Sequence, residues 1–142
     1  MLREVTPDDS RDIQRINNTE LNKGCTLADT TSYLTTLLKD PHQHVLRVSV
    51  DPLTDQVLAY LHAELLTFTY MQPMFIITTL AVSSAYDYDK HASALLTSLI
   101  NLARRRRMTT VRLGFIPDPA TTAFWTQAGF ISQSHGLWDC TI

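Results

Sequence analysis

The chain is poor in the residues that mark metal sites and disulfide scaffolds. Its two cysteines, Cys25 and Cys140, lie near opposite ends of the 142 residues and form no C-x-x-C pair. This spacing predicts neither a disulfide framework nor a thiolate metal site. Of the five histidines, His42 and His44 form a pair in a predicted loop, but no third ligand accompanies them. We therefore predict no metal site.

Long apolar runs and an excess of positive charge are also lacking. No run approaches the ~20 apolar residues that a membrane helix needs, and residues 1–12 carry acidic side chains where a signal peptide would be apolar. The net charge is −2, so no general positive field favours nucleic acid. The four arginines at 104–107 are better explained as cations at the negative end of a helix. We expect a cytoplasmic protein with neither a membrane nor a nucleic-acid partner.

What the chain does contain is an ordinary globular composition with regular apolar periods. Hydrophobic residues make up 44% of it and charged residues 18%, which is enough for one core, so we expect a single domain over residues 1–142. Alternating or continuous apolar runs predict strands at 2–5, 44–50, 56–68, 74–82 and 109–116, with weaker ones after 130. Helical periods bounded by capping residues predict helices at 7–19, 26–40, about 90–107 and 118–129.

Two segments carry motifs. Residues 80–96 are LAVSSAYDYDKHASALL, where an apolar strand runs through a short loop into the most regular helix of the chain, and residues 120–130 are ATTAFWTQAGF. The first resembles the cofactor motif L-x-V-x-P-x-Y-R-G-x-G-x-G-x-x-L-L of the GCN5-related N-acetyltransferase (GNAT) superfamily. The second is similar to the A-x-x-F-Y-x-x-x-G-F helix of that superfamily. The matching positions are Leu80, Val82, Tyr86, Ala92, Leu95 and Leu96 in the first segment and Phe124, Gly129 and Phe130 in the second.

The resemblance implies an α+β fold with a mixed, mostly antiparallel sheet of about six or seven strands and about four helices on its faces. It implies transfer of an acetyl group from acetyl-CoA to an amine of a small molecule or a peptide. It also implies three groups of cofactor contacts. The pantetheine arm would meet the strand backbone at Ala81 and Val82; the thioester would lie beside Phe124 and Trp125; and the pyrophosphate would meet Asp87, Tyr88, Asp89, Lys90, His91, Ala92 and Ser93. Leu80 and Asp118, which matches a common Asn of the superfamily, are further candidates for cofactor binding.

The loop departs from this motif. Asp87 stands where the superfamily has Arg or Gln, and Tyr88 and Lys90 replace glycines. Carboxylates at 87 and 89 compete with a phosphate for the amides at the helix start, whereas Lys90 and His91 can add positive charge. The sequence leaves three functions open: an acetyl-CoA-dependent enzyme, an inactive GNAT-fold module that binds a ligand or a partner, and an enzyme that uses another acyl carrier.

The catalytic groups are the least defined part. Trp125 occupies the position of the usual acidic Tyr, and an indole N–H is a donor rather than a useful acid. The positions that match the usual bases are Ile76, Thr78 and Leu113, none of which is a good base. Glu64 is the nearest substitute, on the same strand face as His62, although both could also simply face solvent. The acceptor is not identified, and the sheet edge leaves a homodimer open.

Overall fold

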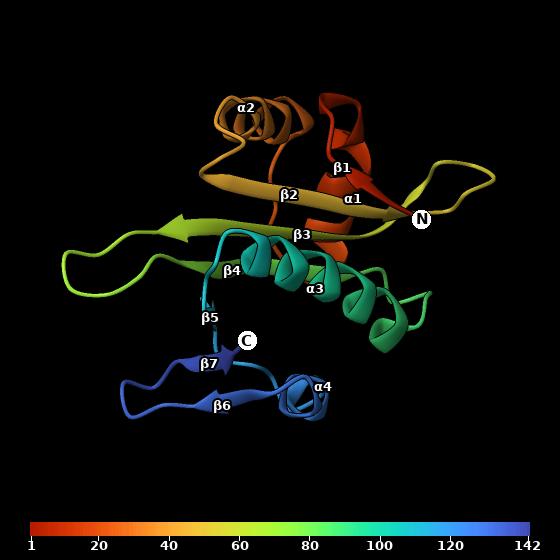
Figure 1. The fold of residues 1–142 in the computed structure, drawn as a ribbon. Helices are drawn as coiled ribbons and strands as arrows, with labels where there is room; N and C mark the ends of the chain where they lie inside the picture. Colours follow the sequence, from red (N-terminus) through yellow and green to blue (C-terminus); the bar gives the residue numbers. More distant parts are fainter.

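One seven-stranded sheet runs through the chain in the computed structural model, which describes all residues 1–142 (Figure 1). The strands are β1 (Leu2–Glu4), β2 (His44–Val50), β3 (Val57–Leu66), β4 (Met74–Val82), β5 (Thr110–Leu113), β6 (Phe130–Ser132) and β7 (Trp138–Thr141). Their spatial order is β1-β2-β3-β4-β5-β7-β6. Neighbours are antiparallel except β4 and β5, which are parallel. The predicted mixed, mostly antiparallel sheet is confirmed.

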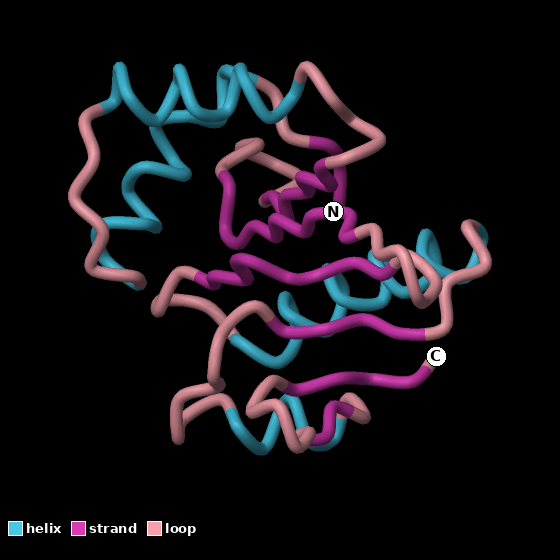
Figure 2. Tube along the Cα trace, turned by 90° about the vertical axis from the view of Figure 1, so that its left-hand side faces the viewer, coloured by secondary structure: helices cyan, strands magenta, loops and turns pink.

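Helices cover both faces of this sheet (Figure 2). They are the 3-10 turn η1 (Pro7–Asp9), α1 (Ser10–Glu20), α2 (Leu27–Leu38), α3 (Tyr88–Arg105) and α4 (Thr122–Gln127). The prediction of a helix over 118–129 was too long, because residues 118–121 form a capped turn rather than helix. The predicted strand at 109–116 was also too long, since β5 ends at Leu113. No helix has the length and apolar character that crossing a membrane requires.

Two apolar cores follow from the alternation of side chains along β3 and β4. The larger lies between the sheet and the helices α3 and α4, and the buried stripe of α3 supplies Ala92, Leu95, Leu96, Leu99 and Ala103. The smaller lies on the opposite face, where α1 and α2 pack on β2, β3 and β4. Because β3 and β4 are covered on both sides, they are apolar at most positions, as a strand buried on both faces should be.

Candidate functional site

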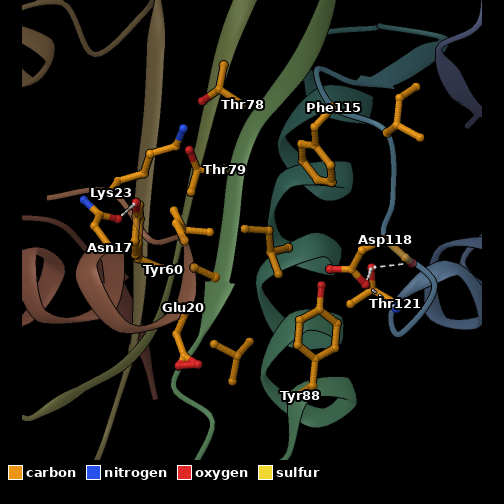
Figure 3. Close-up of a pocket in the computed structure, with 15 residues that line it drawn as sticks. Asn17, Glu20, Lys23, Tyr60, Thr78, Thr79, Tyr88, Phe115, Asp118 and Thr121 are labelled. Carbon is orange, nitrogen blue, oxygen red and sulfur yellow. Dashed lines mark hydrogen bonds between the residues drawn. The ribbon is translucent and has the colours of Figure 1, made fainter.

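Strands β4 and β5 separate partway along their length, and this separation forms the main cleft of the molecule. They pair only from Phe75 to Ile77 on β4, after which one further bond joins the Gly114 amide to the Ile77 carbonyl at 2.8 Å. A Cβ at position 114 would stand 3.0 Å from that carbonyl oxygen, so a glycine allows the close approach where the strands divide. Beyond this point a cleft of ≈ 630 Å³ opens, lined by parts of α1, β3, β4, α3 and residues 115–121 (Figure 3).

A bulge at Thr78 determines which backbone groups of β4 face the cleft. His62 pairs with Thr79, whereas the next residue of β3 pairs with Ile77, so Thr78 is an extra residue in β4. Beyond the bulge the Ser83 amide donates to the Leu58 carbonyl at 2.9 Å.

In an antiparallel ladder, the N–H and C=O groups of successive residues point alternately toward and away from the neighbouring strand. The backbone groups of Thr79 and Ala81 point to β3, and those of Leu80 and Val82 point away from it, into the cleft. Of the two residues predicted to meet the pantetheine arm, Val82 therefore presents free backbone groups and Ala81 does not, whereas Leu80, a further cofactor-binding candidate, does.

The loop before α3 has carboxylates on two of its amides. Asp87 caps the helix and accepts from the Lys90 amide at 3.4 Å. Glu20, at the end of α1, accepts from the Ser84 amide at 3.1 Å. The amides of Tyr88 and Asp89 have no acceptor within the protein, so they remain available to an anion at the positive end of α3.

The compensating positive charge expected in this loop is only partly present. Lys90 is exposed beside the helix start. The His91 ring nitrogen Nδ1 is bonded to the Ser49 hydroxyl at 2.9 Å. Burial first, and the neighbouring Lys90 second, lower the pKa of His91, so the ring tends toward its neutral form. The loop thus has Lys90 as its cation against the carboxylates of Glu20, Asp87 and Asp89.

Tyr88 fills part of the cleft where the superfamily motif has a glycine. Its ring lies edge-on to Phe124 with the centroids 5.5 Å apart, and its hydroxyl points toward Asp118 (Figure 3). Burial first, then the charges of Asp118 and Asp89, raise the pKa of Tyr88 to about 12. The phenol therefore stays protonated and can donate a hydrogen bond into the cleft. Asp118 itself caps the turn before α4, accepting from the Thr121 amide at 3.0 Å.

Trp125 lies in the core rather than in the cleft. Its side chain is fully buried among the rings of Phe115, Phe124 and Phe130, with centroid distances of 5.0 to 5.9 Å, and its indole Nε1 has no hydrogen-bond partner. Phe115 stands between Trp125 and the cleft, which it helps to line. Within α3, Ala92 is buried against the sheet and Ser93 is exposed, and neither residue lines the cleft.

Glu64 does not reach the cleft. It lies on the same strand face as His62, as predicted, but two residues further from the cleft, where it accepts from the Gln43 side chain at 3.4 Å. His62 instead bonds to the Thr78 hydroxyl at 2.8 Å and to His44 at 3.1 Å. The cleft floor also contains residues that no motif indicated, because they come from α1, the loop after it and β3: Asn17, Glu20, Lys23 and Tyr60.

Comparisons with known proteins agree with this geometry at the level of the fold. No protein-family model matches the sequence, and no curated protein matches it either. Among solved structures, glucosamine-6-phosphate N-acetyltransferase from Arabidopsis thaliana superposes with a TM-score of 0.82 at 13% identity, over 94% of this chain and 92% of that one.

Two further structures cover the whole chain. Ribosomal-protein-alanine N-acetyltransferase from Brucella melitensis has a TM-score of 0.79 at 17% identity, over 100% of this chain and 99% of that one. A NatC complex bound to Gag peptide and CoA has a TM-score of 0.75 at 14% identity, over 100% of this chain and 98% of the matched one. The chain therefore has the fold of the GCN5-related N-acetyltransferases.

Proposed function

We propose that this protein is an N-acetyltransferase that binds acetyl-CoA in the cleft between β4 and β5 and transfers the acetyl group to an amine. The free backbone groups of Leu80 and Val82 carry this proposal. Backbone donors and acceptors withdrawn from water need partners. The pantetheine arm has two amide groups on an extended chain, so it can bond to an open strand as another strand would.

The remaining cofactor contacts follow from the same placement. The free amides of Tyr88 and Asp89 would meet the pyrophosphate, and the phenol of Tyr88 would lie against the pantetheine arm. We assign Trp125 an indirect role: it packs on Phe115, which lines the cleft, and on Phe124, which lies behind Tyr88 in the core. Glu64 lies outside the cleft and would likewise act only indirectly. It holds the side chain of Gln43, which precedes β2, against the end of β3.

An amine acceptor is supported by the relatives with this fold, whose names include an amino sugar phosphate, a ribosomal-protein alanine and a peptide. We propose that the acceptor of this protein, a small molecule or a peptide, enters from the side of α1. There Asn17, Lys23 and Tyr60 line the cleft floor, and Tyr60 donates a hydrogen bond to the Asn17 side chain. These groups offer polar contacts without a strong net charge.

The second candidate is a GNAT-fold module that binds a ligand or a partner without acetyl transfer. The contact of Glu20 with the Ser84 amide favours it, because that carboxylate occupies a donor that a pyrophosphate would otherwise use. The ring of Tyr88 in the cleft favours it as well.

Calorimetric titration with acetyl-CoA, acetyl-pantetheine and adenosine 3′,5′-bisphosphate tests both candidates. We expect submillimolar binding of acetyl-CoA, followed by release of free thiol when a panel of amines is added. Acetyl-pantetheine binding as tightly as acetyl-CoA would indicate another acyl carrier. No binding of any of the three at millimolar concentration would contradict the enzyme and favour the module.

A substitution in β4 makes this test specific to the cleft. Val82→Pro removes an N–H that faces the cleft and is not used in the β3–β4 ladder, whereas Val82→Ala keeps it. We expect the proline variant to lose acetyl-CoA affinity by about tenfold or more, the cost of a lost hydrogen bond and a shifted backbone. The alanine variant should retain it, and circular dichroism should show that both variants fold.

A further inference from the structure

A chain of hydrogen bonds runs from the cleft to the outer surface of the sheet through two histidines. Thr78, at the bulge of β4, is exposed at the end of the cleft opposite Tyr88 (Figure 3). Its hydroxyl oxygen lies 2.8 Å from Nδ1 of His62. Nε2 of His62 lies 3.1 Å from Nδ1 of His44, whose side chain is half-exposed. Three side chains from three adjacent strands thus connect the cleft to solvent.

The sheet geometry explains why these side chains meet. His62 pairs with Leu46 in the register of β2 and β3, so His44 is its diagonal neighbour on the same face, and the ring centroids are 5.3 Å apart. The bulge leaves Thr78 unpaired and brings its hydroxyl to the His62 side. The same bulge marks the place where β4 and β5 begin to separate.

We propose that Thr78, His62 and His44 form a proton relay that removes the amine proton during acetyl transfer. The inference rests on the proposed function. Thr78 would contact the amine, and the two histidines would act through it.

Acetyl transfer through this relay moves one proton from the amine to solvent. The amine nitrogen forms a bond to the acyl carbon, the C–S bond breaks, and the thiolate leaves with the electron pair and is protonated by solvent. The amine proton passes to the Thr78 oxygen, the Thr78 proton passes to Nδ1 of His62, and the Nε2 proton of His62 passes to Nδ1 of His44. His44 then releases a proton to solvent. The Thr78 hydroxyl can turn to the His62 backbone carbonyl, which lies 3.1 Å away, and then accepts from the newly protonated Nδ1.

The surroundings of His62 suit a group that passes a proton on rather than storing it. Burial first, and His44 second, lower the pKa of His62 to about 4, and Glu64 opposes this in part. The ring is therefore neutral before and after the step at neutral pH, and only its tautomer changes. The titratable groups that face it are His44 on β2, Tyr60 and Glu64 on β3, and Lys23, Cys25 and Tyr33 from the α1–α2 region.

Variants at Thr78 test the relay with little risk to the fold, because this side chain is exposed. Thr78→Val removes the hydroxyl and Thr78→Ser keeps it. With acetyl-CoA and the best amine of the panel, we expect Thr78→Val to lower kcat by about 100-fold, within the range of general base catalysis. Thr78→Ser should stay within about threefold of the wild type, and the calorimetric Kd of acetyl-CoA should be unchanged in both.

The coupling between variants at Thr78 and His44 distinguishes a relay from a structural pair. His44→Gln should lower kcat in the wild-type background and have little further effect on kcat in the Thr78→Val background, because the relay is already interrupted there. Independent structural roles of Thr78 and His44 predict instead that the two losses multiply in the double variant.

Equal kcat in Thr78→Val and Thr78→Ser, or losses of kcat that multiply in the double variant of Thr78→Val and His44→Gln, would overturn the relay while leaving the proposed function intact. A wild-type protein that neither binds acetyl-CoA nor acetylates any amine would overturn both.

Discussion

The carboxylate of Glu20 gives a direct way to measure what limits phosphate binding at the loop before α3. It accepts from the Ser84 amide at 3.1 Å, beside the free amides of Tyr88 and Asp89. Glu20→Gln keeps the side-chain length and an oxygen that can accept the same hydrogen bond, so the substitution removes only the charge. We expect it to tighten CoA binding.

The magnitude follows from the charges. At about 5–8 Å in a water-like dielectric, two unit charges repel by ~0.5–0.8 kcal/mol. A pyrophosphate with about two charges would gain ~1–1.6 kcal/mol when Glu20 is neutralised, which is a 5- to 15-fold tighter Kd at low salt. Screening over a Debye length of ~8 Å reduces the gain to about 2- to 4-fold at physiological ionic strength.

Calorimetric titration of CoA at several NaCl concentrations measures both values. Glu4→Gln is the matched control, because it makes the same change of net charge at an exposed residue of β1, and its Kd should equal that of the wild type. A Kd of Glu20→Gln that is unchanged or weaker at low salt would refute the reasoning that this carboxylate competes for the loop.

Two further predictions concern stability. Trp125→Ala should lower the free energy of unfolding by ~3–5 kcal/mol in urea denaturation, whereas Trp125→Phe should cost clearly less because the buried indole N–H has no acceptor to lose. For His62, the pKa of about 4 lies below the unfolded value of 6.5, so the unfolded chain binds more protons between these pH values and stability falls as the pH drops through this window. At pH 5 the loss should be about 1–2 kcal/mol after discounting for the partly exposed ring, and His62→Gln should remove this slope.

The strands and helices were predictable because their apolar periods are local. The boundaries that failed depend on tertiary features. Asp118 satisfies the Thr121 amide from a turn, and the sequence of such a turn resembles the first turn of a helix. The end of β5 at Leu113 depends on the separation from β4, which no residue of the segment 109–116 encodes by itself.

The candidate site was predictable only where one continuous segment supplies it. The motif at 80–93 located the strand, the loop and the start of α3. Glu20 was missed because it reaches the loop from α1, at a sequence separation of 64 residues. Trp125 was expected beside the thioester, yet its position on a short helix does not reveal that Phe115 lies in front of it. Alternation correctly put Glu64 on the face of His62, but it cannot tell how far along the strand the cleft extends.

The extra residue at Thr78 makes the length of β4 as important as its composition. If the same residues paired with β3 as a regular strand without the bulge, every backbone group and side chain after Ile77 would exchange sides, so that Thr79 and Ala81 would open toward the cleft and Leu80 would leave the larger core. Deletion of Thr78 itself would instead leave Thr79 opposite His62 and Leu80 opposite Leu61, so the residues after it should keep their sides. The spacing of residues along β4 can be kept while the residues of the loop before α3 change. The segment 80–96 fits this description, because it aligns with the GNAT motif without a gap although the glycines of the motif are gone.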